Sequence, residues 1–172
     1  MVKYWVTKRN APHAAEALEA LGGNGYVEES PMPRLLRDAP LNSVWEGSGN
    51  VIALDVLRAI AKEPAAADAF LAEVGLAAGM DERLDAAVGA AGRDVVAVAA
   101  DPAGAASGAR RLVERLALVL QGSLIVRHSP PAVAEAFLAT RLSRGGGLAF
   151  GTLPRGIDCD SIVDRHRPRM VA

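Results

Sequence analysis

Apolar side chains recur at intervals of three and four residues along most of this chain, and glycines and prolines interrupt the pattern. Such spacing is typical of amphipathic helices. It predicts helices over residues 12–21, 34–39, 65–74, 80–100, 102–126 and 131–142, and one more that begins at Asn42, Ser43 or Ser48 and ends at Lys62. After Ser143 the periodicity stops. The pattern favours an all-α fold, a helical bundle with an irregular C-terminal tail.

The two ends of the chain differ from this regular part. Residues 1–10 are rich in apolar side chains, as in the middle of a helix with partners, yet no helix precedes them to bury that surface. We therefore expect residues 1–143 to form a helical bundle domain that is incomplete at its N-terminus. Residues 144–172 contain three consecutive glycines and a basic stretch from Arg165 to Arg169, and we expect them to form a loop-rich basic tail.

Composition narrows the class of protein. Hydrophobic residues make up 51% of the 172 residues, enough for a sizeable core, and the frequent alanines and leucines favour helix over strand. The single Cys159 excludes an internal disulfide and suits a reducing compartment. The opening residues carry charges where a signal peptide needs an apolar run, and the most apolar stretch, 116–126, is too short to span a bilayer. We expect a cytoplasmic protein with no membrane contact.

Charge is distributed unevenly along the chain. Residues 1–109 carry 9 basic and 15 acidic side chains, whereas residues 110–172 carry 10 basic and 5 acidic ones. A basic segment can attract nucleic acid. The same bias also fits a solvated face or the complement of an acidic neighbour. The histidines, at positions 13, 128 and 166, are too scattered to predict a metal site, so we expect none.

The first motif with possible chemistry is Gly22-Gly23-Asn24-Gly25, directly after the predicted helix 12–21. Closely spaced glycines let a backbone approach a bulky anion such as pyrophosphate, because no Cβ intrudes. The same run is also an ordinary helix stop and turn. It is not a Rossmann fingerprint, since no predicted strand precedes it and the GxGxxG spacing is absent.

The second motif is Trp45-Glu46-Gly47-Ser48-Gly49-Asn50, at the mouth of the next long helix. A carboxylate beside an indole is a candidate general base, because an apolar neighbour can desolvate it. The free N–H groups at a helix start suit an anion, and Gly47 and Gly49 would permit a close approach. The alternative is a structural Glu46 that stabilises the helix dipole.

Taken in order, the runs 21–26, 32–39 and 45–50 resemble the C-terminal domain of the acyl-CoA dehydrogenase family. That family has GGxGY/F, then Arg-Asp-Ala, then Tyr/Trp-Glu-Gly-Thr/Ser at this spacing. The form of the third run, followed by Asp55-Val56-Leu57-Arg58, and the tail Phe150-Gly151-Thr152-Leu153-Pro154 resemble the AidB-type branch, which is linked to the adaptive response to DNA alkylation. The resemblance extends over most of the chain and is densest from Leu18 to Arg58.

The resemblance implies an FAD-dependent oxidoreductase. Glu46 matches the base that removes the α-proton of an acyl-CoA while the flavin takes the β-hydride. The glycine loop matches one that meets the adenosine and pyrophosphate part of FAD, typically that of a neighbouring subunit. The implied cofactor-binding positions are Gly22, Gly23, Gly25, Trp45, Gly47, Ser48 and Asn50.

Arg58 is the candidate for the substrate pocket. If one helix carries Glu46, Asn50 and Arg58, then Asn50 and Arg58 could line the same cavity. The alternative for Arg58 is a helical i,i+3 ion pair with Asp55.

The family also has an N-terminal helical domain and a middle β-domain, and neither is found in these residues. We therefore expect a fragment or a truncated gene product, inactive alone, that associates as a dimer or tetramer as family members do. Two other functions stay open. One is a DNA-associated flavoprotein module that uses residues 110–172, with Arg110, Arg111 and Arg115 as contacts. The other is a non-catalytic helical remnant that only oligomerises.

Overall fold

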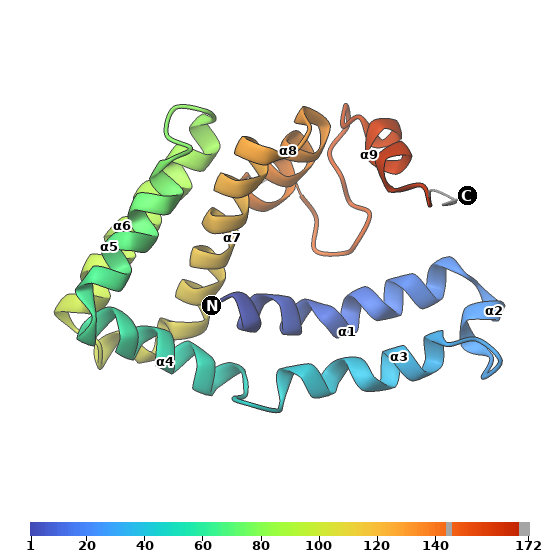
Figure 1. Cartoon of the computed structure of the whole chain (residues 1–172), viewed down its shortest axis with the longest axis horizontal. Coiled ribbons are helices and arrows are strands. Elements are labelled where there is room, and N and C mark those ends of the chain that lie inside the picture. Colours follow the sequence, from blue (N-terminus) through green and yellow to red (C-terminus); the bar gives the residue numbers. More distant parts are fainter. Residues whose placement is uncertain (144–145, 169–172) are drawn as a thin grey trace. The chain divides into compact units, whose positions relative to one another are not determined.

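The computed structural model describes residues 1–143 and 146–168, and within them every regular element is a helix (Figure 1). This confirms the all-α prediction. In chain order the elements are α1 (Val2–Ala20), α2 (Gly23–Tyr26), α3 (Met32–Asp38), the 3₁₀ helix η1 (Ala39–Ser43), α4 (Gly49–Lys62), α5 (Pro64–Gly75), α6 (Glu82–Ala100), the 3₁₀ helix η2 (Gly104–Gly108), α7 (Ala109–His128), α8 (Pro131–Phe137), the π-helix η3 (Leu138–Leu142) and α9 (Cys159–His166). Within this described part, no helix combines the length and apolar character needed to cross a bilayer.

The chain divides into two compact units. The first contains Met1–Asp68 and Arg93–Ala117, and the second contains Ala69–Gly92 and the described part of Leu118–Ala172. Both candidate motifs lie in the first unit. This grouping does not test the predicted domain boundary after residue 143, which stays a prediction.

In the first unit, α1 and α3 lie side by side, because the chain reverses direction around α2 (Figure 1). Helix α1 also packs against η1, where Asn10 Nδ2 donates a hydrogen bond of 3.3 Å to the Ala39 carbonyl. Helix α4 buries Ala53, Leu57 and Ile60, a spacing of four and three residues that keeps them on one face. These contacts fix the two segments on either side of the Trp45–Asn50 motif.

Most predicted helices are present within a few residues, and the differences have local causes. Residues 2–20 form one helix, and the chain leaves it at Gly22, whose φ of 59° is left-handed. Gly23 to Tyr26 then form a further helical turn rather than an open loop. Of the three predicted starts for the helix that ends at Lys62, Ser48 is the correct one: it takes the N-cap position and α4 begins at Gly49. Asn42 and Ser43 belong to η1.

The tail is less irregular than predicted. Its residues 159–166 form α9, and the Asp158 carboxylate accepts hydrogen bonds from Ser161 N at 3.0 Å and Ser161 Oγ at 2.7 Å. These bonds satisfy a donor at the helix start that would otherwise lack a partner. Residues 144, 145 and 169–172 of the predicted tail, including Arg169, lie outside the described residues.

The second unit is built around a small apolar core. One cluster of this core contains the buried side chains of Ala77, Leu84 and Leu138, and four partly buried side chains pack against them: Val88, Val126, Phe137 and Leu142. A Cβ built on Gly122 would lie 2.9 Å from Leu84 Cδ1 and 3.3 Å from Leu142 Cδ1. Gly122 therefore serves close helix packing.

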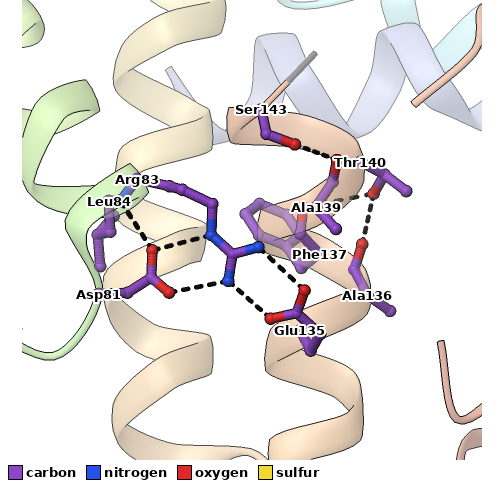
Figure 2. Close-up of polar contacts among 9 residues, drawn as sticks. All are labelled: Asp81, Arg83, Leu84, Glu135, Ala136, Phe137, Ala139, Thr140 and Ser143. Atoms are coloured by element: carbon purple, nitrogen blue, oxygen red, sulfur yellow. Dashed lines mark hydrogen bonds and ion pairs between the residues drawn. The ribbon is translucent and has the colours of Figure 1, made fainter. Parts of the chain in front are cut away.

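A polar network ties the start of α6 to α8 in the same unit. Figure 2 shows the Arg83 guanidinium between two carboxylates, with Asp81 on one side and Glu135 on the other. Arg83 donates to Asp81 at 3.1 and 2.8 Å and to Glu135 at 2.9 and 2.6 Å. Asp81 also accepts from the backbone N–H groups of Arg83 and Leu84, as an N-cap residue does. Hydrogen bonds to Arg83 lower the pKa of Asp81 and the pKa of Glu135.

Replacing Arg83 by methionine is expected to lower the free energy of unfolding by about 2 kcal/mol at neutral pH, because charge-assisted hydrogen bonds are lost and two carboxylates are left without their partner. Both carboxylates have a lowered pKa in the folded state, so their contribution is complete above about pH 5 and is lost as the pH falls below about 4. Urea unfolding between pH 7 and pH 3 measures this. The difference from wild type should shrink in acid.

The matched control is Arg34→Met, which removes an exposed arginine whose Asp38 partner is 3.9 Å away. It is expected to change stability by less than about 0.5 kcal/mol. A loss of stability for Arg83→Met that is equally large at pH 7 and pH 3 would contradict the electrostatic explanation.

Candidate functional site

Glu46 lies in the turn between η1 and α4. Its φ is 52° and that of Gly47 is 106°, both in the left-handed region that favours glycine. The Trp45 side chain is 56% exposed and Glu46 is also exposed. The carboxylate therefore stands on a sharp turn just before a helix, and Trp45 does not bury it within this chain. The expected desolvation by Trp45 alone is not observed.

Glu46 is not on the helix that carries Asn50 and Arg58, so the idea of one helix bearing all three is wrong. The left-handed backbone at residues 46 and 47 cannot continue an α-helix. Arg58 lies eight residues after Asn50 on α4, which places it ~80° further around the helix axis. Arg58 forms an ion pair with Asp55, as the alternative reading predicted, and its substrate role stays a prediction.

Lys3, near the start of α1, contacts the turn that carries Glu46. Its Nζ donates to the carbonyl oxygens of Trp45, Glu46 at 3.0 Å and Gly47 at 3.4 Å. These contacts join residues more than forty positions apart in the chain. The backbone on which Glu46 stands is thus connected directly to α1.

The first residue of α4, Gly49, is buried beneath two cationic side chains. A Cβ built on Gly49 would lie 2.7 Å from Lys8 Cε and 2.9 Å from Arg110 Nη2. The Arg110 guanidinium also lies 6.0 Å from the centre of the Tyr4 ring. Ser48, at the N-cap position, makes no side-chain capping bond, so its hydroxyl does not satisfy the free N–H groups of the helix start. The start of α4 is therefore electropositive and polar.

The glycines of the first motif differ from one another in their surroundings. A Cβ built on Gly22 or Gly23 would meet no atom within 4 Å, so both face open space. A Cβ on Gly25 would lie 2.3 Å from the Leu18 carbonyl oxygen, so the packing of α2 against the end of α1 already requires a glycine there. Space for a ligand exists at Gly22 and Gly23, and Gly25 has a structural reason of its own.

A groove of ≈ 730 Å³ lies just beyond this glycine run. Its lining combines apolar side chains with charged ones: Leu18, Tyr26, Val27, Glu28, Glu29, Pro33, Leu36 and Arg37. Arg37 and Glu28 form a two-pronged ion pair at its edge, with distances of 2.8 and 3.1 Å. Hydrogen bonding to Arg37 lowers the pKa of Glu28.

Sequence reasoning found the two motifs but missed the lysines that contact the second one. Lys3 and Lys8 belong to the opening residues, which have no sequence signal linking them to positions 45–49. The described residues also hold no group of histidine, cysteine, aspartate and glutamate side chains able to bind a metal ion.

Comparison with known proteins places these motifs in one family. The family described as acyl-CoA dehydrogenase, C-terminal domain, matches residues 1–61. The AidB protein of Escherichia coli (strain K12) is 37% identical over 146 residues, which are 85% of this chain and 26% of AidB. Mitochondrial isovaleryl-CoA dehydrogenase of Oryza sativa subsp. japonica is 37% identical over 59 residues, 34% of this chain and 14% of that protein. The chain thus spans about a quarter of the length of AidB.

The fold agrees with this assignment. The crystal structure of Caenorhabditis elegans ACDH-11 in complex with C11-CoA matches 96% of this chain and 32% of its own, with a TM-score of 0.63 and 24% sequence identity. Together with the ordered glycine and Trp-Glu-Gly-Ser motifs, these matches lead to one conclusion. Residues 1–61 belong to the C-terminal domain of the acyl-CoA dehydrogenase family, and the similarity to AidB extends over 85% of the chain.

Proposed function

We propose that this chain is the C-terminal part of an FAD-dependent acyl-CoA dehydrogenase-type oxidoreductase in which Glu46 is the catalytic base. The observation that carries the proposal is the placement of an exposed carboxylate on a sharp turn beside the electropositive start of α4. A base must reach a substrate proton, and a turn projects its side chain away from the helices. The neighbouring cations suit the anionic part of a cofactor.

In this reaction Glu46 takes the proton from the α-carbon of the acyl thioester. The electron pair of that C–H bond becomes the second bond between the α- and β-carbons as hydride leaves the β-carbon. When bound, FAD accepts this hydride. A bound acyl-CoA or another chain must supply the desolvation that Trp45 does not give to Glu46.

The residues around the start of α4 fit the negatively charged pyrophosphate of FAD. Lys8 and Arg110 lie against Gly49, the first residue of α4. The free N–H groups and the dipole of a helix start also favour an anion. Gly22 and Gly23 leave room for the adenosine part. Trp45, Gly47, Ser48 and Asn50 are proposed to complete the contacts to the cofactor.

The chain alone is proposed to be inactive, since it spans 26% of AidB and 32% of ACDH-11. We propose that it works in a homo-oligomer in the cytoplasm. Exposed apolar side chains in the first unit support association, because large apolar groups in water favour contact with another surface. They are Val2, Val6, Leu41, Val44 and Trp45.

The cofactor proposal is tested by the double variant Lys8→Met/Arg110→Met. In the complete protein of which this chain is proposed to be the C-terminal part, the affinity for FAD should fall about 10- to 100-fold, because two charge-assisted contacts to phosphate are lost. Equilibrium dialysis of the apoprotein against FAD measures this affinity.

The dehydrogenase function has a separate test. Anaerobic titration with acyl-CoA thioesters of graded chain length should bleach the absorbance of oxidised flavin in the wild type.

The control is Arg93→Met, which removes an exposed arginine of α6 and should leave FAD affinity within about twofold of wild type. Unchanged affinity in the double variant would remove these two residues from the cofactor site. A flavin that no acyl-CoA reduces would refute the dehydrogenase function itself.

DNA binding through residues 110–172 remains the second candidate function. An ion pair of Arg115 reduces the number of cations available for it. Arg115 forms an ion pair with Asp94, so of the three arginines considered for DNA only Arg110 and Arg111 are exposed. Phosphate binding depends on accessible cations.

A further inference from the structure

We propose that Lys3 is a positioning residue that holds the Glu46 turn in its active geometry, an inference that rests on the proposed role of Glu46 as base. Lys3 Nζ donates to three successive carbonyl oxygens, those of Trp45, Glu46 and Gly47. An ammonium group has three N–H donors and no acceptor, so three carbonyls that converge on it match its full capacity. Lys3 acts through the backbone and does not touch the reacting atoms.

The turn benefits from such a contact because the two flanking helices leave the carbonyl oxygens of residues 45–47 outside their own hydrogen bonding. The first hydrogen bond of α4 runs from Ile52 N to Ser48 O, at 2.9 Å, and so lies beyond the carbonyls of residues 45–47. On the other side, η1 ends with Val44 N and Trp45 N bonded to the Leu41 carbonyl. Residues 45–47 fall between two helices, with left-handed φ at Glu46 and Gly47.

Lys3 is itself held in place by α1. The next residue, Tyr4, is only 8% exposed, and Thr7 Oγ1 donates to the Lys3 carbonyl at 2.8 Å. The ammonium therefore comes from a fixed helix, and its charge strengthens the hydrogen bonds that it donates. Without it, the turn could change conformation and move the Glu46 carboxylate, and a displacement of about 1 Å can lower a rate about 100-fold.

The first test uses hydrogen–deuterium exchange of the backbone amides at residues 44–48, measured by mass spectrometry on this chain. Lys3→Met keeps the aliphatic stem but removes the ammonium. Exchange of the Val44 and Trp45 amides, which donate to the Leu41 carbonyl, should then rise about tenfold, because the turn that follows them opens more often. Lys3→Arg can still donate and should restore most of the protection. The matched control is Lys62→Met, an exposed lysine at the other end of α4, which should leave exchange in this segment unchanged.

The second test separates positioning from folding. In the complete, flavin-loaded protein, Lys3→Met should lower kcat about 10- to 100-fold while KM stays within about twofold, and Lys3→Arg should recover most of kcat. Circular dichroism should show the same helix content in all three variants.

Unchanged amide exchange in Lys3→Met would overturn the proposal, whatever the activity. So would a kcat loss that Lys3→Arg fails to restore at all. If exchange rises as expected but Glu46→Gln keeps full turnover, the assignment of Glu46 as the base is wrong. The conclusion that Lys3 stabilises the turn would still stand.

Discussion

Replacing Glu46 by glutamine is expected to lower the rate of flavin reduction by acyl-CoA about 10²- to 10⁴-fold, the range that general-base catalysis contributes. Glutamine has nearly the same shape as glutamate and can occupy the same turn, but its amide cannot accept the α-proton. The substitution therefore removes the chemistry and leaves the backbone intact. Single-turnover flavin reduction in the complete, flavin-loaded protein, followed anaerobically, measures the chemical step without product release.

Two further variants serve as a control and as a conservative substitution. Glu63→Gln changes a glutamate at the C-terminal end of the same helix, α4, and should leave the rate within about twofold of wild type. Glu46→Asp keeps the carboxylate but withdraws it by one methylene, so an intermediate loss of about 10- to 100-fold is expected. A Glu46→Gln protein that reduces its flavin at the wild-type rate would show that another group removes the proton.

The second large effect concerns stability. Replacing Leu84 by alanine is expected to lower the free energy of unfolding by about 3 kcal/mol, because the side chain is fully buried in the core of the second unit. Removing it leaves a cavity between Ala77 and Leu138 as well as losing apolar burial. Urea unfolding followed by circular dichroism measures the change. A loss below about 1 kcal/mol would mean that the core collapses into the space or that the side chain is not central to it.

Gly122 offers a direct check of the same packing. In the wild type, a methyl group at this position would crowd Leu84 Cδ1 at 2.9 Å, so Gly122→Ala should give little gain despite the higher helix propensity of alanine. In the Leu84→Ala background, the methyl group would enter the vacated space. The double variant should therefore be more stable than Leu84→Ala alone by about 1 kcal/mol, and additive effects would argue against direct contact.

The helical part of the fold could be predicted from the sequence because its signals are local. The break at Glu63-Pro64 and the restart at Pro130-Pro131 mark real helix boundaries, since proline favours the first turn of a helix. The predicted helix start at Pro12 was wrong, because Pro12 lies inside α1. The missed helix α9 had a local signal as well. Asp158, whose carboxylate caps Ser161, is a preferred N-cap residue, but only eight helical residues follow it and their apolar pattern is short.

The candidate site was only partly predictable. The motif around Glu46 was recognisable because its residue types and order are specific. The contacts of Lys3 and Lys8 with it were not, since they depend on how α1 packs beside η1 and α4. The left-handed backbone at Glu46 could not be predicted either, because glutamate, unlike glycine or asparagine, rarely adopts that conformation.

That backbone conformation bears on how this position can vary among relatives. A left-handed conformation costs a residue with a Cβ about 1 kcal/mol, and glycine is almost free of that cost. Selection for stability alone would therefore replace Glu46 by glycine. The proposed role of Glu46 as base offers a reason for a glutamate to stand at this position despite the cost to its backbone. A relative with glycine at this position would have a more relaxed turn and, on the proposed mechanism, would need a base from elsewhere in the fold.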